Sequence, residues 1–308
     1  MTNVLRRATH WNRPLMFFVY VMAVLAVVCA IGVFVDSRVL VGAPIWLKPF
    51  KFAVSFVLYG VTLAWMLTLL PQRSRAAEWA ATVIVAMSVI ELVVIVGQVV
   101  RGQTSHFNGT SALNSALFSV MGAAIMVLFL AHLLIGIVVL IRRIPDRAAA
   151  TAVGWGLGLS LLGMLAAVPM VLPMQEPGID GISGAHSVGV PDGGAGLPVL
   201  GWSTAGGDLR IGHFVGLHAL QALPILAILL SRFAGRLDER TRARLVVVAG
   251  AAYGVLTVLL TWQALRGQPL LRPDAGTLLA VAALVVATAT ASGLVLARRS
   301  RPELALAA

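Results

Sequence analysis

Charged residues are scarce in this chain of 308 residues: they make up 11% of it, whereas hydrophobic residues make up 59%. A soluble globular domain carries about 25% charged residues, because its surface must face water. With so little polar surface this chain cannot cover a soluble core, and its mean hydropathy is +0.94. The deficit excludes an ordinary soluble domain and predicts a protein that uses the lipid bilayer as its solvent.

Cysteine occurs once, at Cys29, inside the first apolar run of the chain. A single cysteine excludes an intramolecular disulfide and any zinc or iron–sulfur site built on cysteine ligands. Cys29 is therefore interpreted as a small buried hydrophobic residue. Lysine is almost as rare, because Lys48 and Lys51 are the only two and every other basic residue is arginine.

Long apolar runs are abundant, and each is close to the length of about 20 residues that a helix needs to cross a bilayer. These runs lie at 15–35, 52–70, 79–100, 113–140, 152–172, 214–233, 245–265 and 277–297. They predict an all-α, polytopic membrane protein with eight transmembrane helices in a single domain, residues 1–308. One long glycine-rich connection, residues 175–211, separates the fifth run from the sixth. Segments of that length are typically lids, binding loops or disordered.

The net charge of +11 comes from arginines that cluster in alternate short loops between the apolar runs. This distribution is typical of membrane orientation under the positive-inside rule, and it argues against binding to nucleic acid. The rule is met when both termini and the segments around Arg73, Arg142 and Arg240 face the cytoplasm. The pattern predicts an N-in, C-in protein of a bacterial-type plasma membrane, with the lipid bilayer as partner. No feature of the sequence indicates an oligomeric state.

Histidines gather on the opposite, extracytoplasmic side, where His106, His186, His213 and His218 lie in or next to the outer loops. Imidazole ligates metals and titrates near neutrality, so His106, His213 and His218 are candidate ligands of a divalent metal or of haem iron. His213 and His218 are five positions apart, about 140° of rotation on an α-helix. Both reach one metal only if the helix starts after His213 or is distorted there.

Two lysines and two acids are the candidate catalytic residues. Lys48 and Lys51 stand at the outer mouth of the second run, and a desolvated lysine can lose its proton where arginine cannot. Glu91 lies near the middle of the third run, where an isolated carboxyl is costly and is by default a functional candidate. Asp208 precedes the sixth run. The plainer alternatives are that the lysines anchor their helix at lipid headgroups and that Glu91 only bonds two helices.

Polar and basic neighbours complete a predicted ligand site at the same face. Arg101 and Arg210 are placed to meet an anionic group, such as a haem propionate or a lipid headgroup. Gln98 follows Glu91 by two helical turns and so projects from the same face of its helix. Gln221 lies in the sixth run. We expect Arg101, Arg210, Gln98 and Gln221 to bind the cofactor or the ligand.

The sequence leaves three functions open. The first is a membrane redox protein with a b-type haem, held by histidines and by basic residues at the propionates. The second is a metal-dependent or acid–base enzyme that acts on a lipid or lipid-linked substrate in the outer leaflet. The third is a transporter or sensor that binds a small molecule in the same pocket, which is weakened because the two halves share no repeat. His132 lies apart from this face, in the inner half of the fourth run, and is interpreted as forming a helix-to-helix hydrogen bond.

Overall fold

The computed structural model describes residues 11–172 and 181–298, and within these ranges eight helices are long and apolar enough to cross a membrane. They are α2 (Arg13–Val35), α3 (Leu47–Thr68), α4 (Arg75–Val100), α5 (Ala112–Arg142), α6 (Arg147–Leu165), α8 (Arg210–Phe233), α9 (Glu239–Leu265) and α10 (Ala275–Ala297). A short helix, α7 (Val168–Val171), follows α6. The prediction of an all-α, multi-pass helical protein is confirmed.

Six of the eight spanning helices begin at a polar residue whose side chain accepts a backbone N–H bond from the first turn. These cap residues are Asn12, Ser74, Ser111, Asp146, Asp238 and Asp274. Each satisfies one of the N–H groups that a helix leaves unpaired at its start. Helices α3 and α8 differ, because neither has a side-chain cap hydrogen bond.

Helices α3 and α8 also begin earlier than their apolar runs predict. Helix α3 starts at Leu47 rather than at residue 52, and α8 starts at Arg210 rather than at residue 214. Hydropathy marks only the part of a helix that hydrocarbon can surround, whereas the backbone hydrogen bonds continue into polar first turns. The two lysines and His213 therefore belong to helices and not to the preceding loops.

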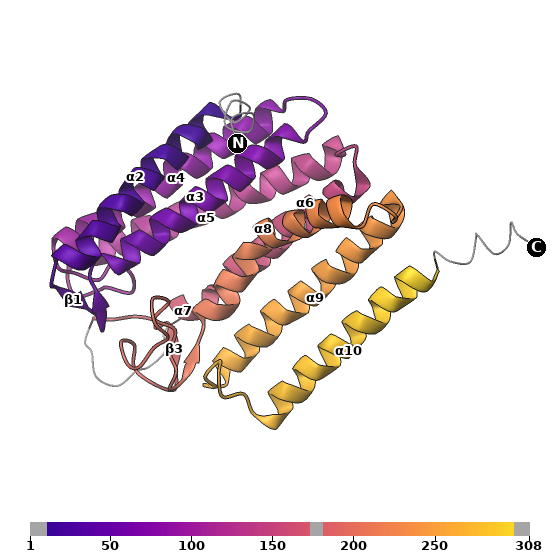
Figure 1. Cartoon of the computed structure of the whole chain (residues 1–308). Helices are drawn as coiled ribbons and strands as arrows, with labels where there is room; N and C mark the ends of the chain where they lie inside the picture. Colours follow the sequence, from indigo (N-terminus) through magenta and orange to yellow (C-terminus); the bar gives the residue numbers. More distant parts are fainter. Residues whose placement is uncertain (1–10, 173–180, 299–308) are drawn as a thin grey trace, which may run out of the picture.

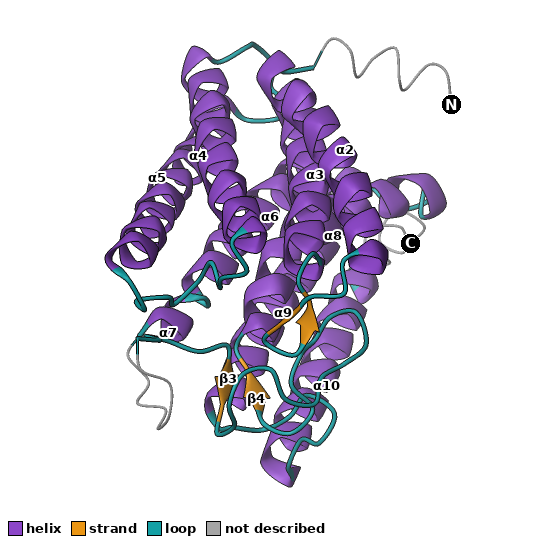
Figure 2. Ribbon diagram, turned by 90° about the vertical axis from the view of Figure 1, so that its left-hand side faces the viewer, coloured by secondary structure: helices purple, strands orange, loops and turns teal. Residues whose placement is uncertain are grey.

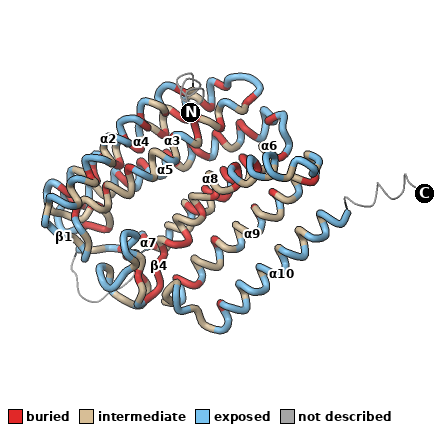
Figure 3. Tube along the Cα trace, viewed as in Figure 1, coloured by how far each residue is buried: buried red, intermediate tan, exposed pale blue. Residues whose placement is uncertain are grey.

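The helices fall into two groups that lie side by side (Figure 1). Helices α2, α3, α4 and α5 form one bundle, while α6, α8 and α9 pack together with α10 outside α9. Helices α6 and α8 approach so closely that a Cβ added to Gly163 would collide with the backbone of Gly216 and Leu217. Small residues at such a crossing permit the van der Waals contact that holds helices together in lipid. Helix α10 is exposed along almost its whole length, as expected of a surface that faces lipid (Figure 3).

The long loop before α8 is folded over its described part, residues 181–209. Two short antiparallel strand pairs lie at the end that is predicted to face outwards: β1 (Val39–Leu40) pairs with β2 (Ala43–Pro44), and β3 (Ser187–Val188) pairs with β4 (Gly207–Asp208). The loop also touches the first helix group, since Ile182 forms a β-bridge with Asn108 and Gly42 lies against the backbone of Gly193. It therefore connects the outer ends of both helix groups (Figure 2). Residues 175–180 of the predicted loop lie outside the described residues.

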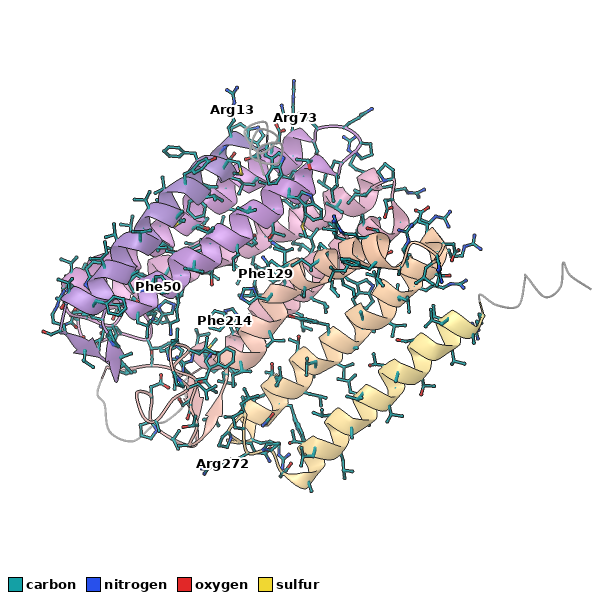
Figure 4. All side chains as sticks on the ribbon, viewed as in Figure 1. Arg13, Phe50, Arg73, Phe129, Phe214 and Arg272 are labelled. Carbon is teal, nitrogen blue, oxygen red and sulfur yellow. The ribbon has the colours of Figure 1, made fainter. Side chains whose placement is uncertain are left out.

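Arg13 and Arg73 lie at one end of the structure, and Arg272 lies at the opposite end (Figure 4). Under the positive-inside rule the first of these ends faces the cytoplasm. We expect reporter tags at either terminus or after Asp238 to give a cytoplasmic signal, and a tag after Gly194 to give an extracytoplasmic one. Paired alkaline phosphatase and fluorescent protein fusions measure this directly. A cytoplasmic signal from the tag after Gly194 would contradict the orientation.

Candidate functional site

Lys48, His106 and Glu91 form a continuous array near the outer end of the first helix group. The Lys48 Nζ atom lies 3.0 Å from His106 Nδ1, and His106 Nε2 lies 3.7 Å from Glu91 Oε1. Lys48 is in the first turn of α3 and Glu91 is in α4, about 13 Å along the axis from the outer end of that helix. His106 belongs to the loop that joins α4 to α5. This loop folds back into the bundle, and so it brings His106 to Glu91.

The direction of each hydrogen bond in this array follows from which groups can donate and which can accept. A lysine ammonium has only donors, so Lys48 donates to the lone pair on His106 Nδ1, and the Ser105 hydroxyl lies 3.0 Å from the same nitrogen. The ring proton of His106 then sits on Nε2, which faces Glu91. At 3.7 Å this contact is longer than a hydrogen bond, and a small side-chain movement makes it one. A neutral His106 can thus accept a proton at one nitrogen and release one at the other.

The surroundings of the array are apolar. Three phenylalanine rings lie around His106 at centroid distances of 6.0, 6.0 and 6.3 Å, those of Phe52, Phe107 and Phe118. Burial, and then the positive charge of Lys48, hold the pKa of His106 well below its usual range, so the ring is neutral at pH 7. Glu91 is only 2% exposed, and its Oε2 has no hydrogen-bond partner among the described residues. Such unpaired buried oxygens are rare in folded proteins, so each one needs an explanation.

His186 and Asp192 form a second polar pair at the same end of the molecule. His186 Nδ1 lies 2.7 Å from Asp192 Oδ2, and the Asp192 carboxylate also accepts the backbone N–H groups of His186 and Ser187. Burial alone would raise the pKa of Asp192, but these hydrogen bonds lower it overall. The Phe107 ring contacts both loop histidines, with centroid distances of 5.0 Å to His186 and 6.0 Å to His106. His186 therefore lies close to the array, and the aspartate that holds it was not among the predicted site residues.

Asp208 is held by Arg210 through two hydrogen bonds, of 2.9 Å from Nε to Oδ1 and 2.6 Å from a terminal nitrogen to Oδ2. Asp208 is fully buried. The same guanidinium donates to the carbonyl oxygen of Gly201, and the neighbouring carbonyl of Leu200 accepts from Lys51 Nζ at 3.0 Å. With both oxygens occupied, Asp208 joins the long loop to the start of α8. Its predicted role as a base stays a prediction.

Arg101 and Gln98 lie in a separate network that closes the turn between α4 and α5. Arg101 donates to Gln98 Oε1 at 2.5 Å and to Asn114 Oδ1 at 3.0 Å. Gln98 Nε2 donates to Asn114 Oδ1 and to the carbonyl oxygen of Thr104. Although Gln98 and Glu91 share a face of α4, Gln98 donates its hydrogen bonds to Asn114 and to the loop backbone, and so it belongs to this network.

His213 and His218 point to different neighbours. His213 Nδ1 lies 2.7 Å from the carbonyl oxygen of Gly163, which ties α8 to α6. His218 Nδ1 lies 3.3 Å from Gln221 Oε1, and Gln221 in turn donates to Thr62 of α3. Because α8 begins at Arg210, His213 is already helical, and the rotation between the two histidines separates their rings.

The predicted metal site finds no support in this geometry. In residues 11–172 and 181–298, no group of three or more His, Cys, Asp or Glu side chains is arranged to hold a metal ion. His106 is engaged with Lys48 and Glu91, while His213 and His218 are engaged with different helices. The three predicted ligands therefore serve separate hydrogen bonds.

His132 forms the helix-to-helix hydrogen bonds that its position predicts. Its Nδ1 lies 2.8 Å from the hydroxyl of Tyr59 in α3, and its Nε2 lies 2.7 Å from the hydroxyl of Ser160 in α6. His132 and Ser160 are fully buried. This network joins the two helix groups in the middle of the bundle, and it needs no ligand to satisfy its polar atoms.

Comparisons of this chain with protein-family models, with curated proteins and with solved structures found no match. The geometry of the site is therefore the guide to its function. Two features distinguish the outer end: the Lys48–His106–Glu91 array, and the cations around residues 200 and 201 of the long loop.

Acidification should destabilise the protein below its neutral range. Burial lowers the pKa of His106 and of His186 below the ordinary value of 6.5. Below that pH the unfolded chain binds protons that the folded protein does not, so the free energy of unfolding falls by up to about 1.4 kcal/mol per pH unit for each such histidine. Thermal unfolding at about pH 7.5 and pH 5 measures the loss. His106→Gln removes the contribution of this histidine, so a loss as large in this variant as in the wild type would contradict the assignment.

Proposed function

We propose that this protein is a multi-pass membrane enzyme that carries out acid–base chemistry on a lipid or lipid-linked substrate at the extracytoplasmic face of a bacterial-type plasma membrane. The observation that carries the proposal is the Lys48–His106–Glu91 array, which three separate segments of the chain contribute. In a protein with 11% charged residues, a chain of three ionisable groups is costly when one of them, Glu91, is buried and the other two are partly buried. A functional role explains why the protein retains these three groups despite their cost.

His106 is the general acid–base in this proposal. In the resting array Lys48 donates to Nδ1 and orients the ring, so an acidic group of the substrate must take the place of the ammonium there. Nδ1 then accepts the substrate proton while the Nε2 proton passes to the Glu91 carboxylate, and the same two transfers in reverse protonate the product and restore both groups. A positioned general acid or base typically accelerates a reaction by about 10²–10⁴-fold. The chemistry requires no cofactor.

The substrate class follows from the location of the array. His106 and Lys48 are only partly buried, and they lie at the outer ends of spanning helices. A molecule that reaches them with a polar headgroup while its apolar part stays in the bilayer fits this position.

A b-type haem is the second candidate, and one observation favours it. His213 Nδ1 lies against the Gly163 carbonyl, so its Nε2 lone pair is free, as in histidines that bind metal. Against it, His106, one of the two other predicted ligands, has polar neighbours at both ring nitrogens. A Soret band in the spectrum of the purified protein, lost in His213→Ala, would favour haem over the acid–base proposal.

The proposal is tested by comparing lipid extracts of cells that express the wild type or a variant. We expect a lipid species that depends on the wild-type protein and is absent with His106→Gln or Lys48→Met. The control is Arg266→Gln, which removes an outer-face cation that is paired with Asp274 away from the array. Identical extracts from wild type and His106→Gln, at equal amounts of inserted protein, would contradict the proposal.

A further inference from the structure

Two unpaired oxygen atoms lie one helical turn apart inside the first helix group. Among the residues that the structure describes, three buried side-chain atoms have no hydrogen-bond partner: Ser88 Oγ, Glu91 Oε2 and Arg242 Nε. The first two belong to α4, where residues three positions apart project from the same face. Ser88 is fully buried and Glu91 is 2% exposed. Two polar atoms without partners in the described protein therefore lie next to each other in the interior of the bundle.

The Ser88 hydroxyl differs from other hydroxyl groups of the spanning helices. Thr62, Ser119 and Thr257 each donate to the carbonyl oxygen four residues before, within their own helix. Such a bond satisfies a hydroxyl group in apolar surroundings. Ser88 forms none within the described ranges, although it lies about 18 Å from the outer end of α4, in the middle of the span. Its hydroxyl is therefore available to a group that does not belong to the helix backbone.

The neighbours of these two oxygens on α4 are apolar. Ile84, Leu92 and Ile95 lie one turn before or after Ser88 or Glu91 on the same face, and all three are buried. Hydrocarbon side chains offer neither a donor nor an acceptor. Glu91 Oε1 faces His106 Nε2 at 3.7 Å, whereas Oε2 does not. Because unbonded polar atoms are costly in such a place, a further polar group between Ser88 and Glu91 is favoured.

The chemistry of the two oxygens selects the group that fits between them. A carboxylate oxygen only accepts hydrogen bonds, whereas a hydroxyl group both donates and accepts. A water molecule can donate to Glu91 Oε2 and exchange a hydrogen bond with Ser88 Oγ. A cation fits less well, since a charged Lys48, a neutral His106 and an ionised Glu91 already sum to zero charge. An added ion would leave an uncompensated charge among apolar side chains, which is costly.

We propose that one water molecule is bound inside the bundle between Ser88 Oγ and Glu91 Oε2, and that Ser88 positions Glu91 through this water. Buried waters in proteins typically bond polar groups that have no other partner. The positioning role rests on the proposed function: the water donates to Oε2 while Oε1 receives the proton of His106. The water itself neither gains nor loses a proton. Its hydrogen bond keeps the carboxylate oriented towards His106.

The sign of a stability change distinguishes a bound water from an unpaired hydroxyl group. Ser88→Ala removes a partner of the water, so we expect a thermal unfolding midpoint about 2 °C below that of Ser119→Ala. Ser119→Ala is the matched control, because Ser119 bonds a carbonyl oxygen of its own helix. Removal of an unpaired Ser88 hydroxyl would instead raise the midpoint, since a buried polar group without a partner is destabilising. A midpoint equal to or above that of Ser119→Ala would overturn the proposal.

Infrared spectroscopy detects the water itself and its bond to Glu91. Difference spectra between neutral and acidic pH are recorded for the protein in lipid nanodiscs, in ordinary water and in water labelled with heavy oxygen. We expect an isotope-sensitive water O–H band in the wild type and in Ser119→Ala that is absent from Ser88→Ala. The C=O band of Glu91, identified by its loss in Glu91→Gln, should move to higher frequency in Ser88→Ala, because it has lost a hydrogen bond. A wild type without the water band, or an unchanged Glu91 band in Ser88→Ala, would contradict the water site.

A sodium ion is the alternative occupant, and its presence is tested by the salt. Unfolding midpoints are compared in sodium chloride and in choline chloride at the same ionic strength. Water between Ser88 and Glu91 predicts equal midpoints in the two salts for the wild type. A midpoint that sodium raises in the wild type but not in Ser88→Ala would assign the position to a cation and exclude the water.

These measurements do not depend on turnover, so they are independent of the test of acid–base chemistry. An isotope-sensitive band that requires Ser88, in a protein without any His106-dependent lipid product, supports the water site and removes the catalytic proposal. A His106-dependent product without that band removes the water site alone.

Discussion

Asp208→Asn should lower the free energy of unfolding by about 3 kcal/mol, because it breaks a buried ion pair and leaves Arg210 without its counter-charge. Asp208 is fully buried, and its carboxylate accepts two hydrogen bonds from the guanidinium and one, of 2.7 Å, from the backbone N–H of Ser203. Asparagine keeps the shape but offers an amide in place of one charged oxygen. The loss should appear as a lower midpoint in thermal or detergent-induced unfolding of the purified protein.

The matched control is Asp36→Asn, which breaks an ion pair with Arg38 at the same face of the molecule. This pair is solvent-exposed, and exposed pairs contribute little to stability. Asparagine can also still accept the hydrogen bond from the Trp46 indole. If Asp208→Asn and Asp36→Asn unfold at the same midpoint, Asp208 does not hold the loop to α8.

Glu91→Gln should abolish activity while the protein still inserts and purifies normally. The substitution preserves the size of the side chain and an oxygen that can accept from His106 Nε2, which lies 3.7 Å away in the wild type. An amide cannot take up a proton, so an array that moves protons stops at this position. The expected loss is about 10²–10⁴-fold in turnover, the usual contribution of a general acid or base. It is measured as the rate of formation of the His106-dependent lipid product.

The control for this substitution lies on the same helix. Glu78→Gln changes a carboxylate in the first turn of α4, at the opposite end of the membrane, where it forms an exposed pair with Arg73. It should leave turnover unchanged. Full turnover in Glu91→Gln would mean that Glu91 only bonds two segments. A large fall in the unfolding midpoint of Glu91→Gln would also favour that structural role.

The membrane class and the eight spans follow from the sequence alone, because hydropathy and span length are properties of each segment by itself. The gathering of polar and ionisable side chains near the outer loops could be predicted for the same reason. His106, Lys48 and Glu91 were each recognisable as costly or reactive residues at their positions. The sequence alone therefore identified the members of the array, although it did not identify the array itself.

Only the tertiary structure decided which of these residues meet. Lys48 reaches Glu91 through His106 because the loop after α4 folds back into the bundle. Asp208 is occupied by Arg210, and His213 lies against the Gly163 carbonyl oxygen of α6. Hydropathy depends on neighbours along the chain, whereas these contacts depend on how helices far apart in sequence pack against each other. A polar residue in a membrane protein must find a partner, but packing determines which one.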